Sequence, residues 1–315
     1  MRCTIGLGIL AAISPALAAT ATQLWNFTEY AVTIENSALR ANGQLLLTTF
    51  DNASLYTLDT LASSPVAELV AKLPGATAIG GIAAIGTDKY AIVGGIRGNY
   101  SYTNETIYTV DFGGNSSSPV IEVVASVPDA IMLNGLASLP AYPHIILATD
   151  SRQGAVFRID TDAGTSELAF EDDLFTYPAN ATTPLGINGI KVSDGYAYFT
   201  NTGQYIFGRI PITDDGYQAG DAEVVTYSDR ASGYDWDDFV FDQSGNIFAA
   251  QTPNAAGQIF LDGTYATLAG GGNSTFFHRP TSVTVTPDGK TLYVTTGGNT
   301  VDGVTYSGQV IEVKL

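Results

Sequence analysis

The sequence predicts an all-β protein, a six-bladed β-propeller with four-stranded blades. A short plan recurs six times: an apolar run, a tight polar turn, a second apolar run, a bend and a third run. The repeat length of about forty to fifty residues, built only from strand-like segments, is typical of propeller blades. No stretch has convincing helical periodicity and no linker divides the chain, so residues 19–315 are predicted to form one domain.

The recurring runs define the second and third strands of each blade. The second runs cover residues 44–49, 90–95, 144–150, 196–202, 246–252 and 291–297. The third runs begin at residues 54, 106, 155, 205, 258 and 309. The dipeptides Asn42-Gly43, Asp194-Gly195 and Asp288-Gly289 favour tight hairpin turns. Three extra-long connections interrupt the plan, at residues 97–105, 171–186 and 299–307.

A fourth, outer strand is expected in every blade. In the first five blades it falls at residues 66–73, 120–127, 166–170, 222–227 and 265–268. The sixth blade reaches Leu315 with only three runs, so the unassigned segment Thr22–Thr28 is predicted to complete it. This closure removes an exposed sheet edge. Trp25 is then expected between blades one and six, or on the outer rim.

Residues 1–18 are predicted to be a secretory signal peptide. Arg2 gives the positive start, residues 5–13 are apolar, and Ala16-Leu17-Ala18 is a small-x-small cleavage site. The single cysteine, Cys3, lies in this segment. We therefore expect a protein of the secretory pathway, secreted or vacuolar, with N-glycans. The acceptor sequons are Asn26, Asn52, Asn99, Asn104, Asn115, Asn180 and Asn273.

The net charge of −18 limits the classes of partner. Nucleic-acid binding requires clustered Lys and Arg, and anionic membrane surfaces attract basic segments. No segment after residue 18 is apolar enough to span a membrane. The expected partners are therefore small-molecule substrates, with neither nucleic acid nor a membrane span.

One position recurs at the start of the innermost strand of each blade. It is occupied by Glu35, Gly80, Asn134, Asn188, Asp237 and Pro280. These points converge on the axis of a propeller, and the four oxygen-bearing side chains are ligands that Ca²⁺ or Mg²⁺ prefers. The alternative is that Asn, Asp and Gly occur there only as turn formers.

These residues resemble a family of six-bladed propellers, the SMP-30/gluconolactonase group. The resemblance rests on Glu35, on Asn-Gly at 134 and 188, and on the run RPTSVTVTPDGKTLYVTTGG from Arg279. It implies that Glu35, Asn134, Asn188 and Asp237 hold a divalent metal that polarises a lactone carbonyl, with Asp237 as the base. The chain departs from the family's pattern at two places: Glu35-Asn36-Ser37 replaces the family's Glu-Gly-Pro, and Asp237-Asp238 replaces its Asp-Gly.

Two segments that precede innermost strands, 171–178 and 276–280, are expected near the channel mouth. His278 is there the candidate proton or hydrogen-bond donor. The alternative is a loop histidine packed on a neighbour. An apolar pocket is predicted from Trp236, Tyr234, Phe276, Phe277, Tyr177 and Met132. The alternative for these side chains is packing between blades.

The chain is also similar to fungal hetero-Diels–Alderases of meroterpenoid biosynthesis in length, signal segment, sequon density and blade pattern. This resemblance implies a cycloaddition of a tropolone ortho-quinone methide to a humulene-type sesquiterpene, with no cofactor required. Pocket donors such as His278, Asn134 and Asn188, or a bound cation, would polarise the quinone-methide oxygen. The alternatives are a metal-dependent lactonase with Asp237 as base, and a non-catalytic propeller that binds a small molecule.

Overall fold

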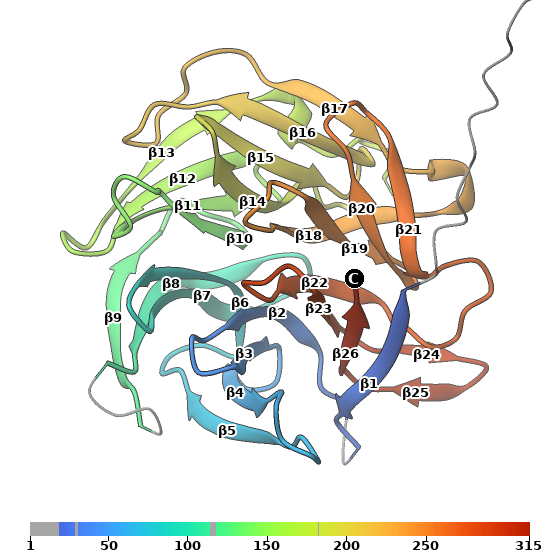
Figure 1. Ribbon diagram of the computed structural model, residues 1–315. Coiled ribbons are helices and arrows are strands. Elements are labelled where there is room, and N and C mark those ends of the chain that lie inside the picture. Colours follow the sequence, from blue (N-terminus) through green and yellow to red (C-terminus); the bar gives the residue numbers. More distant parts are fainter. Residues whose placement is uncertain (1–18, 29–30, 114–117, 182) are drawn as a thin grey trace, which may run out of the picture.

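The computed structural model describes residues 19–28, 31–113, 118–181 and 183–315. These residues form six four-stranded antiparallel sheets arranged in a ring (Figure 1), which confirms the predicted six-bladed propeller. The described residues include two single-turn 3₁₀ helices, η1 (Asp173–Phe175) and η2 (Arg230–Ser232), and no α-helix. None of them forms a helix able to cross a bilayer. The predicted signal segment and the sequon at Asn115 lie outside the described residues.

Each blade runs from an innermost strand at the axis to an outer strand at the rim. The innermost strands are β2 (Ile34–Leu39), β6 (Ala78–Gly86), β10 (Leu133–Ser138), β14 (Ile187–Ser193), β18 (Asp235–Phe241) and β22 (Pro280–Val285). The second strands are β3 (Gln44–Thr49), β7 (Lys89–Arg97), β11 (Ile145–Asp150), β15 (Tyr196–Asn201), β19 (Ile247–Thr252) and β23 (Thr291–Thr296).

The third strands are β4 (Ser54–Asp59), β8 (Tyr102–Asp111), β12 (Ala155–Asp160), β16 (Ile206–Pro211), β20 (Ala255–Ile259) and β26 (Gln309–Lys314). The outer strands are β5 (Ala67–Lys72), β9 (Val120–Ser126), β13 (Thr165–Glu171), β17 (Glu223–Tyr227), β21 (Tyr265–Gly270) and β1 (Thr20–Asn26). A separate hairpin, β24 (Asn299–Val301) and β25 (Val304–Tyr306), is inserted in blade six.

The N-terminal strand closes the ring, as the sequence predicts. Strand β1 pairs antiparallel with β26, with Thr20 opposite Lys314 and Asn26 opposite Gln309 (Figure 1). Trp25 packs against the apolar cluster shared by blades one and six, which confirms its predicted place between them. Both ends of the chain therefore sit in one sheet, and no third strand is left with an open edge.

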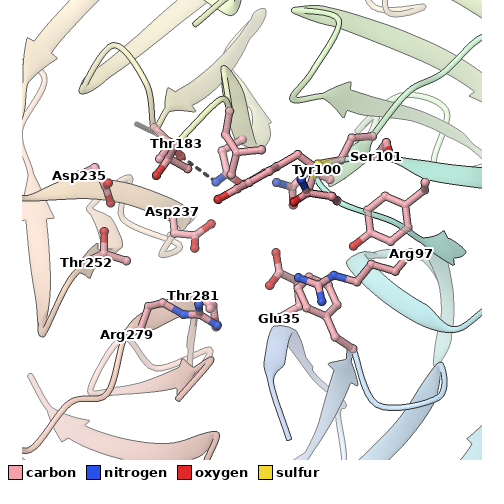
Figure 2. A pocket seen from close by; sticks show the side chains of 18 of the residues that line it. Glu35, Arg97, Tyr100, Ser101, Thr183, Asp235, Asp237, Thr252, Arg279 and Thr281 are labelled. Atoms are coloured by element: carbon pink, nitrogen blue, oxygen red, sulfur yellow. Dashed lines mark hydrogen bonds between the residues drawn. The ribbon is translucent and has the colours of Figure 1, made fainter. Parts of the chain in front are cut away.

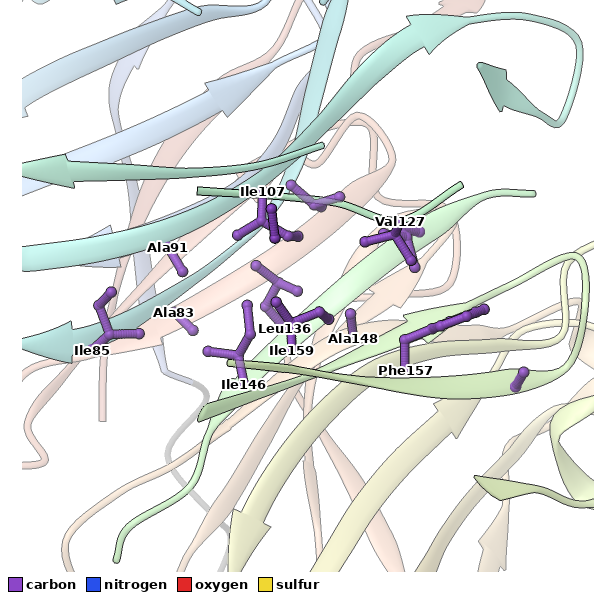
Figure 3. Close-up of a cluster of buried hydrophobic side chains, with 14 residues drawn as sticks. Ala83, Ile85, Ala91, Ile107, Val127, Leu136, Ile146, Ala148, Phe157 and Ile159 are labelled. Atoms are coloured by element: carbon purple, nitrogen blue, oxygen red, sulfur yellow. The ribbon is translucent and has the colours of Figure 1, made fainter. Parts of the chain in front are cut away.

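The hydrophobic core is divided among the blade interfaces. Each pair of adjacent blades shares one buried cluster, so six clusters surround the axis. Figure 3 shows the cluster between blades two and three, where Ile107, Leu136 and Phe157 are at most 3% exposed. Because each sheet is covered on both faces, its inner strands are apolar on both faces as well.

Every innermost strand contains a bulge at the same place. The register with the second strand shifts at residues 34/36, 79/82, 133/136, 187/190, 236/239 and 280/282. A bulge inserts an extra residue and redirects a side chain. In blades one to five the recurring position predicted from sequence lies inside these bulges, whereas in blade six the bulged residue is Thr281 and not Pro280.

Threonine hydroxyl groups of the second strands connect successive bulges. The Thr149 hydroxyl accepts the Gly135 N–H (2.9 Å) and lies 2.6 Å from the Asn188 carbonyl oxygen of the next blade, to which it donates. Thr200 makes the same pair of bonds, to Gly189 N–H and to the Asp237 carbonyl. Each such hydroxyl therefore fixes its own bulge and that of the following blade.

The glycine after each site asparagine is required by this close approach. A Cβ on Gly135 would lie 2.5 Å from the Asn188 carbonyl oxygen, and one on Gly189 would lie 2.4 Å from Asp238 Oδ1. The close approach of the strands thus explains the glycine of each Asn-Gly pair. It does not explain the asparagine, whose side chain belongs to the site described below.

Gly135→Ala is expected to lower the free energy of unfolding by about 1–3 kcal/mol, because the new methyl group would force two inner strands apart. Gly86→Ala is the matched control, since its Cβ would meet only Lys89 Cβ at 3.6 Å. Urea denaturation followed by circular dichroism measures both. Equal stability of the two variants would contradict the close-approach argument.

Candidate functional site

A cavity of about 740 Å³ lies where the innermost strands begin (Figure 2). Its volume is within the range of small-molecule sites. Glu35, Asn134, Asn188 and Asp237 all line this central cavity, so the structure brings together the four residues selected from sequence. Blade six contributes Thr281 instead of the expected Pro280.

The central cavity holds three carboxyl groups and two guanidinium groups, from Glu35, Asp235, Asp237, Arg97 and Arg279. Figure 2 shows Glu35 and Asp237 pointing into the cavity from different sides, with Arg279 reaching in below them. The positive charges of Arg279 and Arg97 favour the ionised form of Glu35. The three acids are half-buried and both arginines are exposed, so the cavity is lined by charged groups at different depths of burial.

Burial changes the protonation of these acids. It raises the pKa of Glu35 from 4.5 to about 7, although Arg279 and Arg97 act in the opposite direction. It also raises the pKa of Asp235 to about 7. The pKa of Asp237 is raised well above its usual value, first by burial and then by the negative charge of Glu35. At neutral pH the cavity therefore retains protonated carboxyl groups that can donate hydrogen bonds.

The two asparagines are oriented by their amide nitrogens. Asn134 Nδ2 donates to the Ser151 hydroxyl at 3.1 Å, and Asn188 Nδ2 donates to the Thr202 hydroxyl at 3.0 Å. Ser151 in turn donates to the Ile187 carbonyl at 2.6 Å. These bonds leave the amide oxygens to accept a hydrogen bond or to ligate a cation.

The donor set fits a hard divalent cation in its chemistry. Two carboxylates and two amide oxygens from Glu35, Asn134, Asn188 and Asp237 line one cavity, and Ca²⁺ and Mg²⁺ prefer such ligands. Within the described ranges, no three His, Cys, Asp or Glu residues are grouped to hold a metal. A cation here would therefore depend on the two amides.

The two departures from the SMP-30 pattern contact each other. Asn36 Nδ2 donates to Asp238 Oδ2 at 2.8 Å, Lys191 Nζ lies 2.7 Å from Asp238 Oδ1, and Ser282 donates to Asn36 Oδ1 at 2.9 Å. Asn36 and Asp238 line a different cavity of about 470 Å³. The substitutions form an axial network and leave Glu35 and Asp237 in the central cavity.

Arg279 is held in an unusual backbone conformation. Its φ is +59°, its N–H donates to the Pro253 carbonyl at 3.0 Å, and its carbonyl accepts the Gly297 N–H at 2.8 Å. A Cβ on Gly297 would lie 2.4 Å from Arg279 Nη2, so the glycine makes room for the guanidinium group. Left-handed backbone at a non-glycine residue costs energy and occurs often at functional sites.

Most of the predicted aromatic wall lies elsewhere. Trp236 is 1% exposed and packs against Phe207 and Tyr265 at the interface of blades four and five. Its neighbours Asp235 and Asp237 line the cavity, and successive side chains of a strand point to opposite faces. Phe277 is 2% exposed in the cluster of blades five and six. For both residues, the alternative of packing between blades is correct.

Two tyrosines of the predicted wall are also not among the lining residues. The Tyr234 hydroxyl donates to Asn254 Oδ1 and accepts the Gly272 N–H, which holds a loop together. The guanidinium carbon of Arg152 lies 5.0 Å from the ring centre of Tyr177. Of the predicted substrate-binding residues, Met132 alone lines the central cavity.

His278 and Phe276 line a second cavity of about 620 Å³ instead of the central one. The His278 ring stacks on Tyr306 with centroids 3.8 Å apart, and its Nδ1 lies 2.9 Å from Asn299 Oδ1. The prediction that placed His278 at the channel mouth is wrong, because the β24–β25 insertion folds against this histidine. Its alternative, a loop histidine packed on a neighbour, is what the structure shows.

Sequence reasoning missed the arginines and the true apolar wall. Arg97 stacks on Phe50, with its guanidinium carbon 4.2 Å from the ring centre. The long connection at residues 97–105 marked this region, because insertions in propellers gather on one face. The apolar and aromatic lining consists of Phe50, Tyr100, Tyr102, Met132, Leu185 and Pro253.

Comparison with known proteins agrees with both resemblances. The chain is 27% identical to a Phoma sp protein provisionally named a hetero-Diels-Alderase, over 90% of this chain and 87% of the other. A second provisionally named hetero-Diels-Alderase, from Sarocladium schorii, is 26% identical over 83% of this chain and 74% of its own. This chain is thus a relative of proteins named hetero-Diels-Alderases. No family profile matches it.

Solved structures show the same fold at low sequence identity. A calcium-binding regucalcin from Agrobacterium tumefaciens superposes with a TM-score of 0.60 and 18% identity, over 90% of this chain and 91% of the other. A provisionally named gluconolactonase superposes with a TM-score of 0.64 and 13% identity, over 95% and 93%. These neighbours show that this chain shares its propeller fold with a regucalcin and a provisionally named gluconolactonase.

The protein is expected to lose stability as the pH rises from about 5 to about 8. The native pKa of Glu35, about 7, exceeds its ordinary value of 4.5, so the folded state binds more protons between these values. Glu35→Gln should reduce this loss, as measured by melting temperatures across the pH range. Glu68→Gln, at an exposed position of β5, is the control. An unchanged pH slope in Glu35→Gln would contradict the raised pKa.

Proposed function

We propose that the central cavity catalyses a hetero-Diels–Alder cycloaddition of a tropolone ortho-quinone methide to a humulene-type sesquiterpene. The observation that carries this proposal is the relationship to two provisionally named hetero-Diels-Alderases over most of the chain. The cavity supports it, because charged, amide and apolar side chains line a single space of about 740 Å³. Such a site can hold a polar ring and an apolar partner side by side.

The reaction places limited demands on the protein. The oxygen and the exocyclic carbon of the quinone methide form one C–O and one C–C bond to the two carbons of the terpene alkene. No group leaves, no proton is transferred and no electron donor is needed. Holding the two partners in one orientation removes translational and rotational freedom before the barrier, which is worth several orders of magnitude in rate. The pocket shape sets the stereochemistry.

Polar side chains that line the cavity can supply donors to the quinone-methide oxygen. Negative charge develops on this oxygen as the new C–C bond forms. The guanidinium groups of Arg97 and Arg279 and the protonated carboxyl group of Glu35 or Asp237 can donate to it. The amide oxygens of Asn134 and Asn188 can accept a hydrogen bond from a hydroxyl group of the polar ring. His278 has no part in this arrangement, since it lines another cavity.

The apolar wall suits the terpene. Phe50, Met132 and Leu185 line the cavity together with Tyr100 and Tyr102. Burying apolar surface stabilises a bound hydrocarbon by about 25 cal/mol per Å². This wall replaces the one that Trp236 and Phe277 were expected to form.

Arg279→Gln is expected to lower kcat/KM of the cycloaddition by about 100-fold, the loss typical of a single donor to a developing oxyanion. Arg209→Gln, which removes an arginine paired with Glu223 away from the cavity, should leave the rate unchanged. The assay mixes an ortho-quinone methide, released in solution, with a humulene-type alkene. Product formation with the same rate and stereoisomer ratio as without protein would refute the cycloaddition and leave a non-catalytic binding propeller.

The same assay provides a pH test of the acids. Because the donating form of Glu35 is the protonated one and its pKa is about 7, the rate should fall as the pH rises above 7. Glu35→Gln keeps an N–H donor and has no such titration, so the fall should be smaller. A rate that is flat across this range in the parent protein would remove the carboxyl groups from the mechanism.

A second candidate function is favoured by the four oxygen donors of the cavity. In a metal-dependent lactonase, Ca²⁺ or Mg²⁺ held by Glu35, Asn134, Asn188 and Asp237 would supply a Lewis acid for the lactone carbonyl. Asp237 would then act as the base for water. EDTA and Asp237→Asn should each abolish lactone hydrolysis, whereas a metal-independent cycloaddition should resist EDTA and lose less than about tenfold in Asp237→Asn, which keeps an N–H donor.

A further inference from the structure

We propose that the sequon at Asn99 carries a glycan that screens the mouth of the central cavity. Asn99 is exposed and also lines the cavity, so it lies on the rim where the cavity opens to solvent. The proposal rests on passage through the secretory pathway, for which residues 1–18 are the predicted signal. It does not depend on which reaction the cavity catalyses.

The acceptor lies at the tip of a hairpin that leans over the cavity. Strands β7 and β8 pair Arg97 with Tyr102, and the Gly98 N–H donates to the Ser101 carbonyl at 2.7 Å. Asn99 and Tyr100 are therefore the two tip residues, and Tyr100 has a φ of +51°. All six residues from 97 to 102 line the cavity, and Figure 2 shows Tyr100 and Ser101 above it.

The hairpin is fixed on both sides. The Arg97 N–H donates to the Thr77 hydroxyl at 2.9 Å, and the Tyr102 N–H donates to the Ile131 carbonyl at 2.8 Å. The Arg97 guanidinium group lies over Phe50, a residue of blade one. A group attached to Asn99 therefore stays beside the mouth instead of swinging away with a loose loop.

The modification step is the usual transfer to a sequon amide. The Asn99 Nδ2 forms a bond to the first sugar of an oligosaccharide carried by a polyisoprenyl pyrophosphate. The bond from that sugar to the pyrophosphate breaks, the lipid pyrophosphate leaves, and the amide loses one proton. The attached oligosaccharide is bulky and hydrated, so it blocks large molecules more than small ones.

Another sequon supplies a matched control. Asn273 is exposed and does not line the central cavity. A glycan at this position adds the same mass and the same solubility from a residue that is not part of the cavity lining. Two substitutions at Ser101 form a second matched comparison. Ser101→Thr keeps the sequon, whereas Ser101→Ala destroys it and leaves Asn99 unchanged.

The test measures access to the cavity by thiol labelling. Thr252, which lines the cavity and points into it in Figure 2, is replaced by cysteine in protein secreted from a eukaryotic host. The only natural cysteine, Cys3, lies in the predicted signal, and protein without Thr252→Cys measures any background. Iodoacetamide serves as the small reagent and a long polyethylene-glycol maleimide as the large one. Mass spectrometry of glycopeptides reports occupancy at Asn99 and Asn273.

We expect glycopeptide analysis to show a glycan on Asn99. The labelling rate with the long maleimide should be about tenfold higher in Asn99→Gln and in Ser101→Ala than in the Thr252→Cys parent. Ser101→Thr and Asn273→Gln should label like the parent, and the rate with iodoacetamide should be the same in all of them. An unmodified Asn99 in the secreted protein overturns the proposal. So does a large-reagent rate that is unaffected by loss of the Asn99 glycan.

Discussion

The site depends on the way each innermost strand is bulged and tied to its neighbour at the axis. Hydroxyl groups of Thr149 and Thr200 accept an N–H within their own bulge and donate to the carbonyl of the next blade. Gly135 and Gly189 allow the strands to approach closely enough for these bonds. Since a buried carbonyl without a partner is costly, this arrangement fixes the bulges that present Asn134, Asn188 and Asp237. The cavity residues are thus placed by backbone geometry before any ligand is considered.

The bulges also divide successive residues between two ends of the channel. Glu35 and Asp237 face the central cavity, whereas the next residues, Asn36 and Asp238, bond to each other in the axial network. Asn36 and Asp238, which depart from the SMP-30 pattern, therefore compensate for each other by forming a hydrogen bond. Arg97 and Arg279 give the central cavity positive charge from the protein itself, and burial raises the pKa of Glu35 and Asp235 to about 7, so that each is partly protonated at neutral pH. A site with such donors can polarise an oxygen without a nucleophile.

The proteins that share the fold and the relatives in sequence carry different functional names. The propeller architecture is shared with a regucalcin and a gluconolactonase at identities that establish the fold alone. The relationship over most of the chain is to proteins provisionally named hetero-Diels-Alderases. The oxygen donors of the hub are compatible with both chemistries, because carboxyl and amide groups can ligate a cation or form hydrogen bonds with a substrate. The apolar lining residues Phe50, Met132 and Leu185 are the feature that suits a hydrocarbon partner.

The sequence by itself determined the blade number, the closure by β1 and the four hub residues Glu35, Asn134, Asn188 and Asp237, because all of these follow from a repeat in register. Only the tertiary structure decided which other side chains line the central cavity. Trp236 lies between two cavity acids in sequence yet faces the core, because side chains alternate along a strand. His278 is turned to another cavity by an inserted hairpin, and Arg97 reaches the hub from a second strand. Such contacts depend on loops and blade orientation, which do not repeat from blade to blade and leave no period in the sequence.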